Sequence, residues 1–372
     1  MQNDKHIYYF DYIRIIAAIC VIFMHAAAGP LRGDINLNWQ FTNAVTSFAF
    51  TAVPLFFMMS GYLLVSSKKT LDISVLLKKR LPRLVLPLIG WTVVAVLWSM
   101  YLARDFSIAS LYNRITSSFT TPASVHMWYM YTLIAIYLIS PIIAGGINAL
   151  DKKGKIFVAV LASLPSIKII AVTLLPDFLD KYFQFDFITK MEFFGGHLCT
   201  FILGYMLGSI KKKIPNWVLI PSALLVFCVI TAGTYLKTIE TGEYNQSFQH
   251  QAAGFEVLLA ALVFLIFKQN FNKPSLFTKR VPLVPLSLSI YLMHNILLSM
   301  MFSVGFTLPG FLGTLGITFA NLVICFFVLK TVATVKPLCF IATGIPYKEA
   351  CDTCNWVYTF RWIRVALKGK EN

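Results

Sequence analysis

Residues 10–25 read FDYIRIIAAICVIFMH, an apolar stretch with three ionisable side chains, Asp11, Arg14 and His25. In a helix each residue turns about 100° and rises about 1.5 Å, which places Arg14 and His25 about 20° apart around the axis and about 16 Å apart along it. Asp11 lies on the same side and is the i,i+3 neighbour of Arg14. An Arg at mid-bilayer costs about 2.5–3.5 kcal/mol unless it is paired, packed against protein or in contact with water. The stretch therefore predicts a transmembrane helix with one polar face.

The composition of the whole chain is that of a polytopic membrane protein. Of 372 residues, 58% are hydrophobic and 13% charged, whereas soluble domains carry about 25% charged residues. Because about 20 apolar residues cross a bilayer, we expect an all-α fold with about ten transmembrane helices. The expected spans are residues 10–30, 42–65, 84–103, 127–147, 156–176, 193–210, 217–236, 251–268, 283–305 and 311–333.

The positive charge alternates along these spans. Every second connection is rich in Lys and Arg, namely residues 68–83, 152–155, 211–213 and 273–280, and so is the segment that follows residue 335. Cytoplasmic loops carry such an excess, so both termini are predicted to be cytoplasmic. This distribution explains the net charge of +16 without a nucleic-acid partner. The predicted partner of the chain is the lipid bilayer.

The sequence divides into a membrane-embedded domain, residues 1–335, and a cytoplasmic tail, residues 336–372. In the tail, Trp356–Val365 mixes aromatic residues with Arg, which favours an amphipathic helix that lies on the inner membrane surface. Cys351 and Cys354 have the C-x-x-C spacing but lack a second ligand pair, so we predict neither a metal site nor a redox site.

Simpler interpretations compete for the first helix. Lys5 before an apolar run, with Ala26–Ala28 after it, imitates a signal peptide, although Asp11 and Arg14 and the many later spans disfavour this. Alternatively, Asp11 and Arg14 only mark the cytoplasmic end of the span, and His25 is an interfacial histidine.

Further candidate residues lie near the membrane surfaces. Arg14, Arg80 and Arg83 are all expected on the cytoplasmic side, where guanidinium groups can bind phosphate oxygens in a bidentate fork. The simpler explanation, positive-inside charge, suffices for the neighbouring lysines. His126 precedes Met127-Trp128-Tyr129 at the outer start of a span, which is also typical of an aromatic belt.

The order of these motifs resembles that of acyltransferase family 3, the integral membrane O-acyltransferases that include common-antigen and O-antigen O-acetyltransferases. The resemblance covers roughly residues 9–335. Each motif is short, and their specificity comes from their order and topology. The matching residues are Asp11, Arg14 and His25 in the first helix; Phe56-Phe57 with Ser60-Gly61-Tyr62-Leu63; Lys79-Arg80-Leu81-Pro82-Arg83 with Pro87; His126-Met127-Trp128-Tyr129; and Tyr291-Leu292-Met293-His294.

The resemblance implies a membrane enzyme that transfers an acetyl group from cytoplasmic acetyl-CoA to a hydroxyl of a surface or lipid-linked glycan. His25 would be the general base or a transient acyl carrier, assisted by Asp11 and His126. Arg14, Arg80 and Arg83 would bind the donor, and Ser60 and Gly61 would let the backbone approach the acyl chain. The implied location is a bacterial-type inner membrane, with glycan-assembly proteins as partners. Unlike for the two-domain members of this family, we expect no extracytoplasmic hydrolase-like domain in this sequence.

Two other functions remain open from the residues alone. A proton-coupled transporter or flippase could use Asp11, Arg14 and His25 as a proton relay, but repeated halves with interrupted spans, frequent in transporters, are not apparent. A structural or regulatory membrane protein could use the polar face only for helix packing. Chemistry that depends on CoA separates the enzyme from both.

Overall fold

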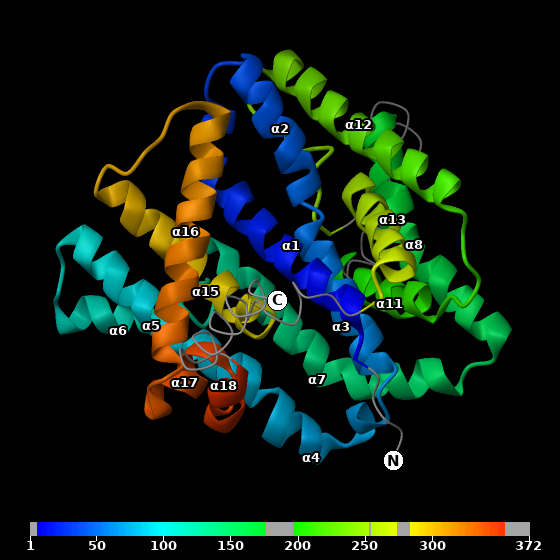
Figure 1. Cartoon of the computed structure of the whole chain (residues 1–372), viewed down its shortest axis with the longest axis horizontal. Helices are drawn as coiled ribbons and strands as arrows, with labels where there is room; N and C mark the ends of the chain where they lie inside the picture. Colours follow the sequence, from blue (N-terminus) through cyan, green and yellow to red (C-terminus); the bar gives the residue numbers. More distant parts are fainter. Residues whose placement is uncertain (1–5, 176–195, 253, 274–282, 354–372) are drawn as a thin grey trace, which may run out of the picture. The chain divides into compact units, whose positions relative to one another are not determined.

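The computed structural model describes residues 6–175, 196–252, 254–273 and 283–353, and within these ranges it consists of helices without any strand (Figure 1). This confirms the predicted all-α fold. Eight helical stretches in these ranges are long and apolar enough to cross a membrane: Tyr8–Ala26, Leu37–Val65, Ile73–Ala103, Val125–Ala149, Lys152–Leu174, Asn216–Thr241, Leu283–Ser303 and Gly310–Val332. The chain is a multi-pass membrane protein. The total of ten spans and the cytoplasmic termini stay predictions.

Two of the predicted spans coincide with shorter helices. Helix α11 covers Gly196–Ser209, 14 residues, and α13 covers Phe255–Asn270, 16 residues. At about 1.5 Å per residue these helices are about 21 and 24 Å long, less than the roughly 30 Å of a hydrocarbon core. Residues 176–195, where the predicted span at 193–210 begins, lie outside the described ranges.

The chain forms two compact units that interleave along the sequence. Unit 1 comprises Met1–Ile73, Ile139–Lys273 and Pro309–Thr314, and unit 2 comprises Ser74–Leu138, Pro274–Leu308 and Leu315–Asn372. Helices of unit 1 are α1 (Tyr8–Ala26), α2 (Leu37–Ala49), α3 (Ala52–Val65), α8 (Lys152–Leu174), α11, α12 (Asn216–Thr241) and α13. Helices of unit 2 include α5 (Pro82–Ala103), α6 (Ile108–Ser117), α15 (Leu283–Ser303), α17 (Lys336–Thr343) and α18 (Tyr347–Thr353). Among the longer helices described, α7 (Trp128–Ala149) and α16 (Gly310–Val332) contribute residues to both units.

Unit 1 is built around the crossing of α3 and α11, which lie side by side (Figure 1). Three glycines permit the close approach: a Cβ at Gly61 would meet the Phe201 carbonyl, one at Gly204 the Met58 backbone, and one at Gly208 the Tyr62 ring. Small residues let transmembrane helices pack backbone to backbone in this way. Helix α1 packs against α3, and both contribute to one apolar core.

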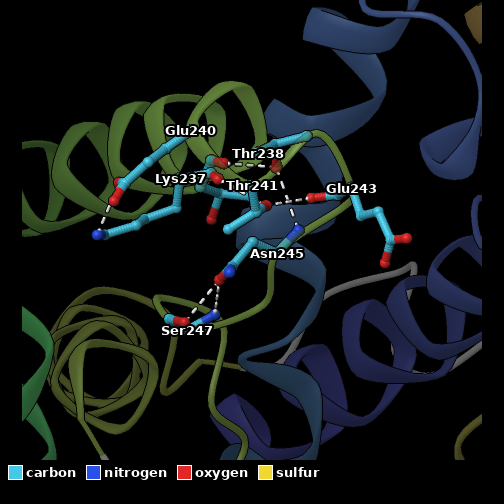
Figure 2. Close-up of polar contacts among 8 residues, drawn as sticks. Lys237, Thr238, Glu240, Thr241, Glu243, Asn245 and Ser247 are labelled. Atoms are coloured by element: carbon cyan, nitrogen blue, oxygen red, sulfur yellow. Dashed lines mark hydrogen bonds and ion pairs between the residues drawn. The ribbon is translucent and has the colours of Figure 1, made fainter.

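The C-terminal end of α12 is fixed by a chain of local hydrogen bonds (Figure 2). Gly242 ends the helix in the left-handed region, at φ 72°, which glycine adopts without a steric cost. The Thr238 hydroxyl then accepts a bond of 3.2 Å from the Asn245 amide, and the Asn245 side chain accepts one of 2.9 Å from the Ser247 amide (Figure 2). These bonds direct the loop that follows α12, residues 242–252, back over unit 1.

In unit 2 the first residues of the predicted tail pack against a membrane helix. The Trp91 indole of α5 donates a 3.0 Å hydrogen bond to the Ala342 carbonyl of α17. Gly90 lies so close to Ile341 that a Cβ there would meet its main-chain oxygen. The predicted amphipathic helix at Trp356–Val365 and the second cysteine of the C-x-x-C pair, Cys354, lie outside the described residues.

Candidate functional site

The inner part of α1 holds the first group of predicted site residues. Asp11 is buried, at 3% exposure, and one carboxylate oxygen lies 3.8 Å from Nη1 of Arg14, while the other lies 2.5 Å from Nε2 of His6. The Arg14 side chain keeps 31% exposure. Burying a carboxylate without a partner costs free energy, and the neighbouring Arg14 and His6 reduce this cost for Asp11. The same contact orients the Arg14 guanidinium. The sequence predicted the Asp11–Arg14 pair, but not the contribution of His6.

His25 lies in the last turn of the same helix and is half-buried. Because α1 is helical from Tyr8 to Ala26, the predicted geometry of one polar face holds, with Arg14 and His25 about 20° apart and about three turns apart along the axis. The 242–252 loop reaches the same end of α1, where the Gln251 amide lies 3.6 Å from the Met24 sulfur. His25 therefore lies at the end of α1 that is next to the polar loop of residues 242–252.

A buried polar cluster of unit 1 joins this loop to α2. The Gln249 amide donates to Asn43 Oδ1 at 3.2 Å and to Ser47 Oγ at 3.0 Å, and the Tyr244 hydroxyl donates to Gln249 Oε1. The Asn43 amide in turn donates to the Thr231 carbonyl at 3.0 Å. Burial raises the pKa of Tyr244 above its ordinary value, so this hydroxyl stays a donor at neutral pH. The sequence analysis did not predict this cluster, although polar residues such as Asn43 within an apolar span indicate function by default.

Glu256, in the first turn of α13, is the most unusual member of unit 1. It is fully buried, and neither carboxylate oxygen has a hydrogen-bond partner among the described residues. The Tyr244 ring lies close enough for the two groups to interact electrostatically. Sequence reasoning missed Glu256, although an ionisable residue inside an apolar span indicates function by default.

In unit 2 the structure brings together two predicted motifs. His126 is 1% exposed and His294 is fully buried, and their ring centroids lie 4.8 Å apart. His126 Nε2 lies 3.0 Å from the Leu292 carbonyl oxygen, and its Nδ1 lies 3.0 Å from the Ser124 hydroxyl. The Tyr291 hydroxyl donates to the His126 carbonyl. Ser124 was not among the predicted site residues.

The predicted donor-binding arginines of unit 2 lie at the start of α5. Arg80 ends the π-helical turn Leu76–Arg80 and is half-buried. Arg83 is about half exposed, and its Nη2 lies 3.2 Å from a carboxylate oxygen of Glu349 in α18. A half-exposed ion pair of this kind is worth about 0–1 kcal/mol, so a phosphate can displace it. Arg14 belongs to the other unit.

Ser60 and Gly61 lie in the middle of α3. The backbone at Gly61 is approached by the Phe201 carbonyl of α11, so the structure gives this glycine a packing role. Ser60 is half-buried. Their predicted role in binding the acyl donor stays a prediction.

A comparison with protein families gives one match. The model of acyltransferase family 3, described as an acyltransferase domain, matches residues 7–330, which include every predicted site residue. No curated protein and no solved structure matches the chain.

Proposed function

Because this chain belongs to acyltransferase family 3, we propose that it is a membrane O-acyltransferase that moves an acetyl group from cytoplasmic acetyl-CoA to a hydroxyl of a surface or lipid-linked glycan. The membrane is a bacterial-type inner membrane, and glycan-assembly proteins present the acceptor. The observation that carries the proposal is the polar face of α1, with the Asp11–Arg14 pair in its first turns and His25 in its last.

His25 acts as the general base on the acceptor. Its imidazole takes the proton of the acceptor hydroxyl as the hydroxyl oxygen attacks the acyl carbonyl. The carbon–sulfur bond then breaks, and the imidazolium returns this proton to the departing thiolate of CoA. General-base help of this kind contributes about 10²–10⁴ in rate. Asp11 holds the Arg14 guanidinium in position, as their separation of 3.8 Å supports.

The donor carries phosphates, and the arginines have the chemistry that binds them. A guanidinium binds phosphate oxygens through two parallel hydrogen bonds. Arg80 and Arg83 lie in the most basic connection of the chain, which is predicted to be cytoplasmic. The contact between Arg83 and Glu349 would be exchanged for a phosphate contact when the donor binds. The transporter alternative has no comparable support, because the family match is to an acyltransferase.

The test is release of CoA from acetyl-CoA by the purified protein in vesicles, with a surface-glycan extract as acceptor source. We expect wild-type protein to release CoA and acetylate the glycan, and His25→Ala to lose about 10²–10⁴ of that rate. His250→Ala is the matched control, since His250 is an exposed histidine of the same unit. Wild-type activity in His25→Ala would exclude His25 as the base, and a wild-type protein that neither binds acetyl-CoA nor releases CoA would exclude the enzyme.

A further inference from the structure

Ser124 and His126 of unit 2 form a pair that the proposed function does not use. Ser124 Oγ lies 3.0 Å from His126 Nδ1. Ser124 is half-buried, whereas the His126 ring is almost completely enclosed. A nucleophile and a base within about 2.6–3.2 Å, with the base oriented by a third group, is the arrangement of covalent catalysis by a hydroxyl.

The hydrogen bonds of His126 decide which nitrogen can act as the base. Nε2 lies 3.0 Å from the Leu292 carbonyl oxygen, which can only accept a hydrogen bond. The neutral imidazole therefore carries its proton on Nε2 and has its lone pair on Nδ1. It follows that the Ser124 hydroxyl donates to Nδ1, the direction in which a serine passes its proton to a base.

The Ser124 oxygen also accepts a hydrogen bond. The Asn295 amide donates a 3.1 Å hydrogen bond to Ser124 Oγ. This bond orients the serine oxygen, and it stabilises the negative charge on that oxygen when it leaves the ester. The Tyr291 hydroxyl also holds the main chain at His126 by donating to its carbonyl. Leu292, Asn295 and Tyr291 all belong to α15, so one helix fixes both the base and the nucleophile.

We propose that Ser124 carries the acyl group as a covalent ester during transfer. This inference rests on the proposed function and adds an intermediate to it. Ser124 Oγ attacks the thioester carbonyl, the carbon–sulfur bond breaks, and His126 passes the serine proton to the departing thiolate. The acceptor hydroxyl then attacks the ester and the bond from carbon to Ser124 Oγ breaks. The acceptor's proton is released to solvent, and Ser124 Oγ regains a proton from solvent through His126.

The predicted topology gives this intermediate a purpose. Residue 124 precedes a span that starts on the extracytoplasmic side, whereas the donor is cytoplasmic. An ester on Ser124 keeps the acyl group on the acceptor's side of the membrane after CoA has left. Donor and acceptor then do not have to be bound at the same time.

Ser124 could instead only orient the His126 ring, and the experiment separates the two roles. Protein in vesicles is incubated with radiolabelled acetyl-CoA without acceptor, quenched in acid and digested, and the peptide that contains residue 124 is analysed by mass spectrometry. The proposal predicts an acetyl group on Ser124 that only alkaline hydroxylamine removes. In Ser124→Cys the label is a thioester that neutral hydroxylamine removes. An orienting serine carries no label in either protein.

Controls and rates complete the test. Ser124→Ala should lose the label and at least about 10² of the transfer rate. Ser303→Ala should match wild type, because it removes an exposed hydroxyl that bonds, within the described part of the chain, only to the Met300 carbonyl, at 2.8 Å. His25→Ala should still label Ser124 but not acetylate glycan. Wild-type transfer by Ser124→Ala would overturn the proposal, and so would release of CoA without label on Ser124. A wild-type protein that releases no CoA would instead overturn the proposed function.

Discussion

The rings of His126 and His294 lie 4.8 Å apart at an angle of 69°. The Leu292 carbonyl accepts a hydrogen bond from His126 Nε2. The His294 carbonyl accepts a 3.0 Å hydrogen bond from the Asn321 amide of α16. The H-x-W and Y-L-x-H motifs of the sequence are therefore two parts of one buried histidine pair. Groups in such contact are expected to act together rather than independently.

The histidine pair predicts non-additive effects on acyl transfer. We expect His126→Gln to lower the rate by about 10² or more, because it removes the base that faces Ser124. His294→Gln should lower the rate less. The double variant should be no slower than His126→Gln, because the second substitution has little further effect once the first has disabled two residues that act together. The rates of release of CoA by the four proteins give the coupling; strictly multiplicative losses would show that His294 acts independently.

Arg14→Lys tests whether the planar fork matters at this position. The ammonium of Lys keeps the charge beside Asp11 but cannot make two parallel bonds to phosphate or carboxylate. A hydrogen bond to a charged group is worth about 1.5–3 kcal/mol, so kcat/KM for acetyl-CoA should fall about 10- to 100-fold.

The matched control for this variant is Arg32→Lys, an exposed arginine of the same unit that should behave as wild type. Steady-state kinetics with varied acetyl-CoA decide the matter. If KM and kcat of Arg14→Lys both equal the wild-type values, Arg14 contacts neither the phosphates nor the thioester.

Gly61→Ala tests the crossing of α3 and α11. The added Cβ would meet the Phe201 carbonyl, which belongs to a helix backbone and cannot turn aside. Overpacking of a tight contact costs about 1–3 kcal/mol and sometimes more, so the melting temperature in detergent should fall clearly. Gly146→Ala is the control, because a Cβ there meets nothing within 4 Å, and a helical Ala in place of Gly should be neutral or stabilising. Equal melting temperatures for the two variants would contradict the close packing.

Sequence alone was sufficient where a single helix decides the geometry. Asp11, Arg14 and His25 lie on one continuous helix, so the periodicity of α1 by itself determines their relative positions. The apolar segments likewise predicted an all-α membrane protein, because each span is a local property of about 20 residues. The ion-pair partner of Arg83 was harder to predict from the sequence, because Glu349 comes from a helix that is distant along the chain.

The unpredicted parts of the sites depend on tertiary packing. Nothing in the local sequence says that Gln249, in a loop, reaches Asn43 and Ser47 on α2, or that Asn295 donates to Ser124. Gly61 was interpreted as a place for a ligand, and the structure shows the Phe201 carbonyl at this glycine. A glycine that permits close approach does not by itself identify what approaches.

Glu256 provides the last prediction, which sets stability against function. Its carboxyl group is fully buried without a hydrogen-bond partner among the described residues, a condition that costs about 1–3 kcal/mol or more. Glu256→Met keeps a similar volume and removes the polar atoms, so this variant should melt at a higher temperature than wild type. Costly polar groups persist where function requires them, so we expect the same variant to transfer acyl groups more slowly.

Glu243→Met is the matched control for this substitution, because Glu243 is exposed in the loop after α12 and its replacement should change neither property (Figure 2). Thermal melting in detergent and release of CoA are measured on the same preparations. A Glu256→Met protein that is less stable than wild type would mean that the carboxyl group stabilises the folded protein. One that is more stable and fully active would mean that Glu256 takes no part in acyl transfer. Higher stability together with slower transfer is the result expected if this carboxyl group binds the acceptor or accepts its proton.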